Sequence, residues 1–302
     1  MTRKKLWMGI PTSHMQWVPQ PLIDSSVTRS RHVETIKFEN GGGDIYRSKP
    51  YQMVYNLELF GGAHDLEGID AYNKFASGFY GDGLFHMAYP PTFETNLFPA
   101  HWASPGLIEQ GWPNIYGGSS TIVNATPSFS DTASNSYNQP PRSATWSTVG
   151  QAPESFGLGP ASVYIAIPEG YALWVGWSGS VTGDATLQMS SISADGTASS
   201  PTDLTPISPA SSARLNTSTG GASAQISISN KTTDTGGTIT ITSMMAQLWK
   251  TGITPTLTGN HVPGEGHTGL DFADDAVEET YAYLYPPKKG LSTSLIEVGA
   301  WR

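Results

Sequence analysis

The chain has no cysteine and few basic residues, and both shortages restrict what it can be. With Cys 0 in 302 residues, disulfides, thiolate metal sites and a cysteine nucleophile are excluded, which fits synthesis in a reducing cytoplasm. Only 16 lysines and arginines stand against 25 aspartates and glutamates, so the formal net charge at pH 7 is −9. Nucleic acids and anionic membranes attract basic surfaces. We therefore expect neither of them as a partner.

Long hydrophobic runs are also missing. The basic cluster at the start is followed by an apolar run of only five residues before Pro11, which is too short for a signal peptide. No stretch approaches the roughly 20 apolar residues that a membrane-spanning helix needs. The hydrophobic fraction of 38% nevertheless suffices for real cores, and the length predicts two folding units.

One stretch, at about 65–80, has the period of an amphipathic helix. Asp65 is a good N-cap, Asp70 and Lys74 have the i,i+4 spacing of an ion pair, and glycines from Gly78 onward end the helix. The apolar positions that recur every three or four residues are Leu66, Ile69, Tyr72, Phe75 or Ala76, and Phe79. Because a lone helix of this length is marginal in water, we expect this face to pack on a sheet.

Alternation of apolar and polar residues predicts strands in the rest of the chain. Residues 51–59 alternate as in a half-buried antiparallel hairpin. At the other end, 279–285 and 292–301 are two further strand candidates, which are too few to make a domain alone. We expect them to return to the sheet of residues 1–116 and close a discontinuous domain. Near the start, residues 4–9 are a first strand candidate, and the proline-punctuated stretch 11–22 that follows is expected to be an extended arm.

The middle of the chain differs from both ends in charge. Residues 117–250 contain 11 charged residues, whereas 1–116 contain 20 and the shorter 251–302 contain 10. This contrast indicates an insertion. Short alternating runs separated by turn residues predict an antiparallel β-sandwich there. A change of register in its last run predicts a β-bulge near Ser243.

The predicted fold class is therefore mainly β with one principal helix. An α+β domain is formed by 1–116 and 255–302, a connecting segment occupies 117–150, and the inserted sandwich occupies 151–254. We expect the sandwich to lie outside the discontinuous domain, so that deletion of 150–250 leaves a folded, oligomeric product.

Catalytic and metal-binding patterns are weak. The nearest cluster, His261, Glu265, His267 and Asp271, can gather a divalent cation on one loop, but a solvated polar turn explains it equally well. The consecutive carboxylates of 274–279 are typical of a solvated surface rather than of a glycosidase acid pair. Neither a nucleophile-elbow motif nor a phosphate loop occurs. We expect no enzymatic activity, no cofactor and no metal.

Trp174 and Trp177 are the candidate binding aromatics. They are three residues apart in one predicted strand, so their side chains lie on opposite faces. One is expected in the core, whereas the other can stack on a sugar ring or on a neighbouring subunit.

Five stretches together resemble a known family. They are the hairpin Tyr51 to Leu59, the helix segment HDLEGIDAYNKFASGFYGDGLFHM, Asn96 to Pro99 (NLFP), Trp102 to Leu107 (WASPGL) and the closing LIEVGAW, Leu295 to Trp301. The combination resembles distal tail proteins, a class of minor tail proteins of long-tailed phages that infect actinobacteria. The likeness covers 1–116 and 255–302, and the sandwich has only a carbohydrate-binding-like architecture in common with such proteins.

The resemblance implies a structural virion protein at the distal end of the phage tail, made in the host cytoplasm. Such proteins form a ring, usually a hexamer, that joins the tail tube protein to the tail tip and hub proteins of the baseplate, and no enzymatic residues come with them. The arm at 11–22 and the aromatic hairpin are then ring contacts. The alternative is a carbohydrate-binding host-adhesion module without enzymatic activity, in which the sandwich binds host surface polysaccharide. A glycan-cleaving tail enzyme is disfavoured because no separated acid pair is visible.

Overall fold

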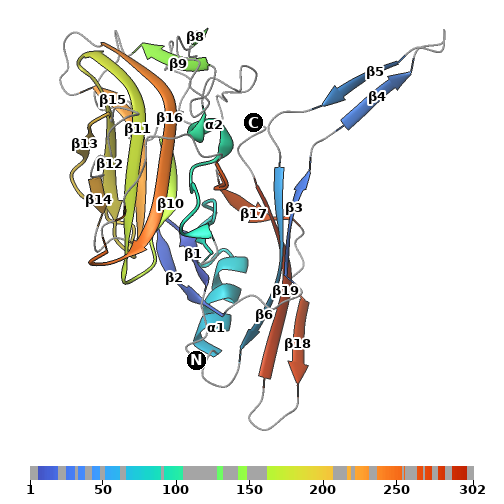
Figure 1. Ribbon diagram of the computed structural model, residues 1–302. Helices are drawn as coiled ribbons and strands as arrows, with labels where there is room; N and C mark the ends of the chain where they lie inside the picture. The colour runs from blue at the N-terminus through green and yellow to red at the C-terminus, as the bar shows by residue number, and fades with distance from the viewer. Residues whose placement is uncertain are drawn as a thin grey trace.

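The computed structural model contains two β-rich regions with a helix between them (Figure 1). It describes residues 6–19, 25–30, 33–37, 43–47, 52–61, 66–89, 92–104, 128–131, 142–147, 162–206, 216–218, 222–230, 237–253, 255, 264–267, 269–273, 278–282 and 288–297. The described part is mainly β and antiparallel, with one principal helix, as the sequence predicts.

Strands from both ends of the chain form one antiparallel sheet. Its members are β3 (Ser26–Ser30), β6 (Gln52–Gly61), β17 (Leu270–Phe272), β18 (Glu278–Ala282) and β19 (Lys288–Glu297). The order is β17-β19-β6-β3, with β18 also paired to β19. Leu291 pairs with Leu59 and Leu295 with Tyr55, so the predicted return of the C-terminal strands to the N-terminal sheet is confirmed.

A two-stranded ribbon projects from this sheet. β4 (Val33–Lys37) and β5 (Gly43–Arg47) pair with each other and with no other strand in the described ranges. In the chain they lie between β3 and β6, and Figure 1 shows the ribbon extending well beyond the body. Residues 38–42, which connect the two strands, lie outside the described residues.

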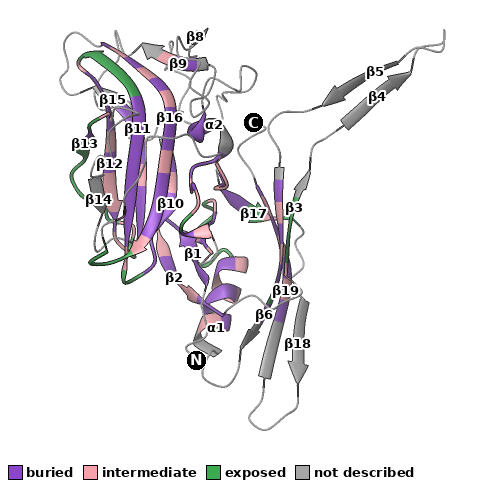
Figure 2. Ribbon diagram, in the orientation of Figure 1, coloured by how far each residue is buried: buried purple, intermediate pink, exposed green. Residues whose placement is uncertain are grey.

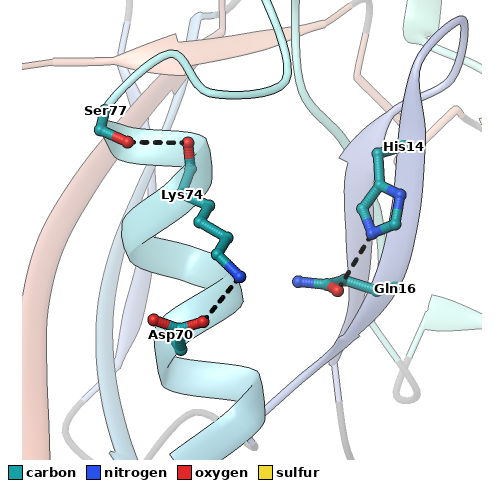
Figure 3. Close-up of polar contacts among 5 residues, drawn as sticks. All are labelled: His14, Gln16, Asp70, Lys74 and Ser77. Atoms are coloured by element: carbon teal, nitrogen blue, oxygen red, sulfur yellow. Dashed lines mark hydrogen bonds and ion pairs between the residues drawn. The ribbon is translucent and has the colours of Figure 1, made fainter.

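Helix α1 (Leu66–Ala76) covers the sheet with the predicted face. Ile69, Tyr72 and Phe75 are fully buried and belong to the same apolar cluster as Leu59 of β6 and Leu295 of β19. The expected ion pair between Asp70 and Lys74 is present at 2.8 Å (Figure 3).

The predicted helix end is wrong by about four residues. The helix stops at Ala76, Gly78 adopts a left-handed φ of 70°, and the Phe79 amide closes the end by donating to the carbonyl of Lys74 at 2.9 Å. This C-cap turns the chain outward. Phe79 is consequently 71% exposed instead of buried, and the proposed N-cap Asp65 lies outside the described residues.

The proline-punctuated arm is also corrected. Its first part forms β2 (His14–Val18), which pairs with β1 (Leu6–Ile10), and β1 pairs in turn with β7 (His86–Ala88). Met15 and Val18 are buried, so burial of these side chains holds the segment in a ladder.

The middle of the chain forms the predicted sandwich. One sheet has the order β10-β15-β12-β13 and the other β14-β11-β16-β9-β8. Their bounds are β8 (Ser128–Asp131), β9 (Arg142–Ser147), β10 (Ser162–Ala166), β11 (Tyr171–Gly183), β12 (Ala185–Ile192), β13 (Thr202–Leu204), β14 (Asn216–Ser218), β15 (Ser223–Asn230) and β16 (Gly237–Lys250). Figure 2 shows buried residues running along both sheets. Strands β8 and β9 lie in the segment 117–150 that the sequence assigns to a connection.

The predicted β-bulge is present beside Ser243. Ser178 pairs with Ser243, but the next residue, Gly179, pairs with Ile241. Thr242 is therefore the extra residue, and it shifts the inward-facing positions of β16 from one register to the other.

The sandwich does not lie outside the rest of the molecule, contrary to our expectation. Residues 92–104, which include the short helix α2 (Ala100–Ala103), run along β16: the Leu97 amide donates to Ala246 at 2.9 Å and the Leu248 amide to Phe93 at 2.8 Å. Trp7 of β1 donates from its indole to the Ala222 carbonyl at 2.9 Å. The apolar side chains of these segments share one continuous core with the sandwich.

Candidate functional site

A cavity of about 170 Å³ lies where the N-terminal sheet meets the sandwich. Its wall combines residues from β3 and β6, from β7 and the residue after it, from the segment 92–97, from β10, and from the segment 264–267. The apolar, aromatic and ionisable side chains that line it include Val27, Met53, Tyr55, Met87, Tyr89, Tyr164, Glu265 and His267. The cavity is therefore mostly apolar, with three phenols and one carboxylate at its wall.

Local strand periodicity places these groups. On β6 the inward-facing positions are Met53 and Tyr55, both buried. On β10 Val163 points into the sandwich core, which turns the half-buried Tyr164 outward to the junction. The cavity thus forms where two strands from separate sheets face each other.

Two buried histidines lie at this junction. The rings of His86 and His267 are 5.3 Å apart between centroids, and the side chains are 3% and 9% exposed. Nε2 of His267 lies 3.3 Å from both the nitrogen and the oxygen of the Met87 backbone. Within the described part of the chain, Nδ1 of either ring has no hydrogen-bond partner.

Burial keeps both imidazoles neutral. It lowers the pKa of His267 from 6.5 to about 4. Burial also lowers the pKa of His86 well below its ordinary value, and repulsion from the protonated form of His267 lowers it further. At neutral pH these rings are uncharged groups in an apolar wall.

The cluster considered for a metal is not assembled in the described part of the chain. No group of three or more histidine, aspartate or glutamate side chains there is placed to hold a metal ion. His267 is buried against Met87, whereas Asp271 is exposed and accepts a hydrogen bond from the Phe272 amide at 2.8 Å. His261 lies outside the described residues.

Trp174 and Trp177 lie on opposite faces of β11, and both are buried. Trp177 is 1% exposed, and its indole donates to the Leu204 carbonyl at 3.0 Å, which links the two sheets. Trp174 is 7% exposed and packs with Ala172, Met245 and Trp249. Neither indole offers an open ring face for stacking on a sugar in this conformation.

Sequence reasoning missed the exposed aromatic. Among the described large hydrophobic residues, Phe79 is exposed at 71% and Val27, at the cavity, at 50%. The Lys74 ammonium lies 6.0 Å from the centre of the Phe79 ring. Gly78, directly before Phe79, could have indicated this exposure. A glycine C-cap ends the helix, so the residue after it no longer lies on the buried helical face.

None of the helices in the described ranges is long and apolar enough to cross a membrane. Comparison of the chain with protein-family models, with curated proteins and with solved structures finds no match in any of the three.

Proposed function

We propose that this chain is a structural subunit that assembles with copies of itself into a closed ring. The sequence resemblance favours the distal tail ring of a long-tailed phage, which joins the tail tube to the tail tip proteins. The role is non-enzymatic, because the sequence lacks a nucleophile motif and a separated acid pair.

The projecting β4-β5 ribbon is the observation that carries the proposal. An isolated two-stranded ribbon is at best marginally stable in water, and the outer edges of β4 and β5 are unpaired within the described structure. Unpaired strand edges are templates for pairing with another chain. A ribbon that leaves its own body is best stabilised by the body of a neighbouring copy.

Ring closure supports the same reading. A closed cyclic ring needs two different surfaces on each subunit, one for each neighbour. The ribbon supplies one surface that reaches outward, and the edge strand β3 of the sheet lies at its base. The chain therefore offers a projecting element and a separate body to receive it.

A hairpin replacement tests the proposal. Ser30 pairs with Gln52 at the last rung of β3 and β6, so replacing residues 31–51 by Asn-Gly closes these strands with a favoured two-residue turn. Sedimentation velocity should show a ring for the full chain and a folded monomer for the variant. Thermal unfolding of the variant serves as the control, since among the strands that the structure describes the removed ones pair only with each other. An unchanged oligomer would contradict the role of the ribbon, and a monomeric full chain would contradict the ring.

A further inference from the structure

We propose that Phe79 of one copy inserts into the junction cavity of the next copy and forms a second contact of the ring. This inference rests on the proposed ring assembly and names a contact within it. It pairs the most exposed large apolar side chain in the described part with the cavity between the N-terminal sheet and the sandwich.

Phe79 is built as a protruding group. The left-handed Gly78 and the hydrogen bond from the Phe79 amide to Lys74 fix the turn that presents the ring. Tyr80 packs edge-on against Phe79 with centroids 5.2 Å apart and is itself stacked on His14 at 4.3 Å. The backbone of a turn held by these contacts loses little conformational entropy on binding, and the ring that it presents is 71% exposed.

The cavity matches a phenyl ring in size and chemistry. A dry apolar cavity of about 150 Å³ is known to take up benzene, and this one measures about 170 Å³. Met53 and Met87 line it, and thioether sulfurs make favourable contacts with aromatic rings. Tyr55, Tyr89 and Tyr164 offer the edge-to-face contacts that aromatic pairs prefer.

The surroundings of the two surfaces are also complementary. Val27 lines the cavity and is 50% exposed, so apolar surface continues out of the cavity to meet the turn around Phe79. Lys74 accompanies the Phe79 ring at 6.0 Å, whereas Glu265 lies at the cavity wall. Insertion of Phe79 would bring this cation toward that carboxylate.

The absence of cysteine allows a direct test. A variant with Asp82→Cys and Val27→Cys keeps Phe79, because Asp82 is exposed and its carboxylate lies beside Gly78 of the same turn. It carries one thiol at the protruding turn and one at the cavity, and a short bis-maleimide should link successive copies into a ladder extending to the full ring. Each single-cysteine variant can give no more than a dimer. The matched control is Ile253→Cys with Val27→Cys, because Ile253 is exposed at 46% but belongs to neither surface, and it should give no ladder.

A second measurement covers the case in which thiols disturb the contact. Phe79→Ser should raise the dissociation constant of the assembly by about 30-fold or more, as expected for a central aromatic contact worth at least about 2 kcal/mol, whereas Ile253→Ser should leave it unchanged. Val27→Trp, which narrows access to the cavity from an exposed position, should act like Phe79→Ser.

The outcomes separate this contact from the ring itself. An intact ring that gives no ladder and tolerates Phe79→Ser would overturn the Phe79 contact and leave the proposed function standing. A full chain that is monomeric at high concentration would overturn both. Saturable binding of free benzene to the assembled ring would show an empty cavity, and it would also overturn the contact.

Discussion

At the scale of single residues, the fold depends on a few aromatic side chains that the helical period identifies. Phe75 is 2% exposed and packs edge-on against Phe85 at 5.6 Å. Truncation leaves a cavity under α1, so Phe75→Ala should lower the free energy of unfolding by about 3 to 5 kcal/mol. Urea unfolding measures this.

The neighbouring Lys74 is the matched control. Its exposed ion pair with Asp70 lies on the solvent face of the same helix turn, and such pairs contribute little. Lys74→Ala should leave the urea midpoint nearly unchanged. Equal losses for Phe75→Ala and Lys74→Ala would show that the helix faces are assigned wrongly.

His267 should make the stability of the protein depend on pH. Because burial lowers its folded-state pKa from 6.5 to about 4, the unfolded chain binds more protons than the folded chain between these two values. The free energy of unfolding should therefore fall as pH falls through this window, by about 3 kcal/mol at most, at 1.36 kcal/mol per unit. Unfolding titrations at pH 7 and pH 4 measure the loss.

The rings closest to His267 are His86 at 5.3 Å and Tyr55 at 6.1 Å. Burial also lowers the pKa of His86, so His86 should add to the loss in the same direction. Glu265, two residues away, is the carboxylate that lies in the same cavity wall. His267→Asn does not titrate and should lose this part of the pH dependence. If His267→Asn had the same pH profile as the parent, the pH dependence of the free energy of unfolding would arise from another group.

The spacing of apolar residues in the sequence predicts burial well within a regular helix or strand, and poorly beyond the residue where that element ends. Ile69, Tyr72 and Phe75 were assigned correctly, whereas Phe79 was not, because one left-handed glycine broke the phase. Trp174 and Trp177 were placed on opposite faces correctly. Their exposure was not predictable, because it depends on residues such as Trp249 that are far away in the sequence.

At the scale of elements, β19 is the strand that joins the two ends of the chain. It pairs with β6 on one side and with β17 and β18 on the other, and its Leu291 and Leu295 lie in the core beneath α1. Deletion of 279–302 removes this strand, so the product should lose cooperative unfolding as followed by circular dichroism. A soluble, cooperatively folded product would contradict the closure of the sheet by the C-terminal strands.

Alternation also predicted most strands of the sandwich and the bulge at Ser243, because those strands bury one side of a regular pleat. It did not predict that residues 93–97 bind along β16. Asn96 holds that segment by donating to the Met244 carbonyl at 2.8 Å and accepting from the Ala246 amide at 3.1 Å. Backbone pairing of this kind leaves no periodic pattern in an irregular segment, so the sequence carries no signal for it.

At the scale of the whole molecule, the continuous core changes what a large deletion should do. Removal of 150–250 would expose Phe98 and Trp102, each 0% exposed in the intact chain, together with Trp7. We therefore expect this deletion to give an aggregated or unfolded product, in contrast to the folded one that the sequence alone suggests. A soluble product with a cooperative thermal transition would show that residues 1–116 and 255–302 fold independently of the sandwich.

Native mass spectrometry of the purified full chain measures whether copies of this chain close into a ring. We expect one dominant assembly with an integral number of copies, six by the family resemblance, each of 32.3 kDa. Dilution should release subunits without populating longer open chains, because a closed ring has no free ends. A strictly monomeric chain at high concentration, or an open series of oligomers without a preferred size, would rule out the closed ring.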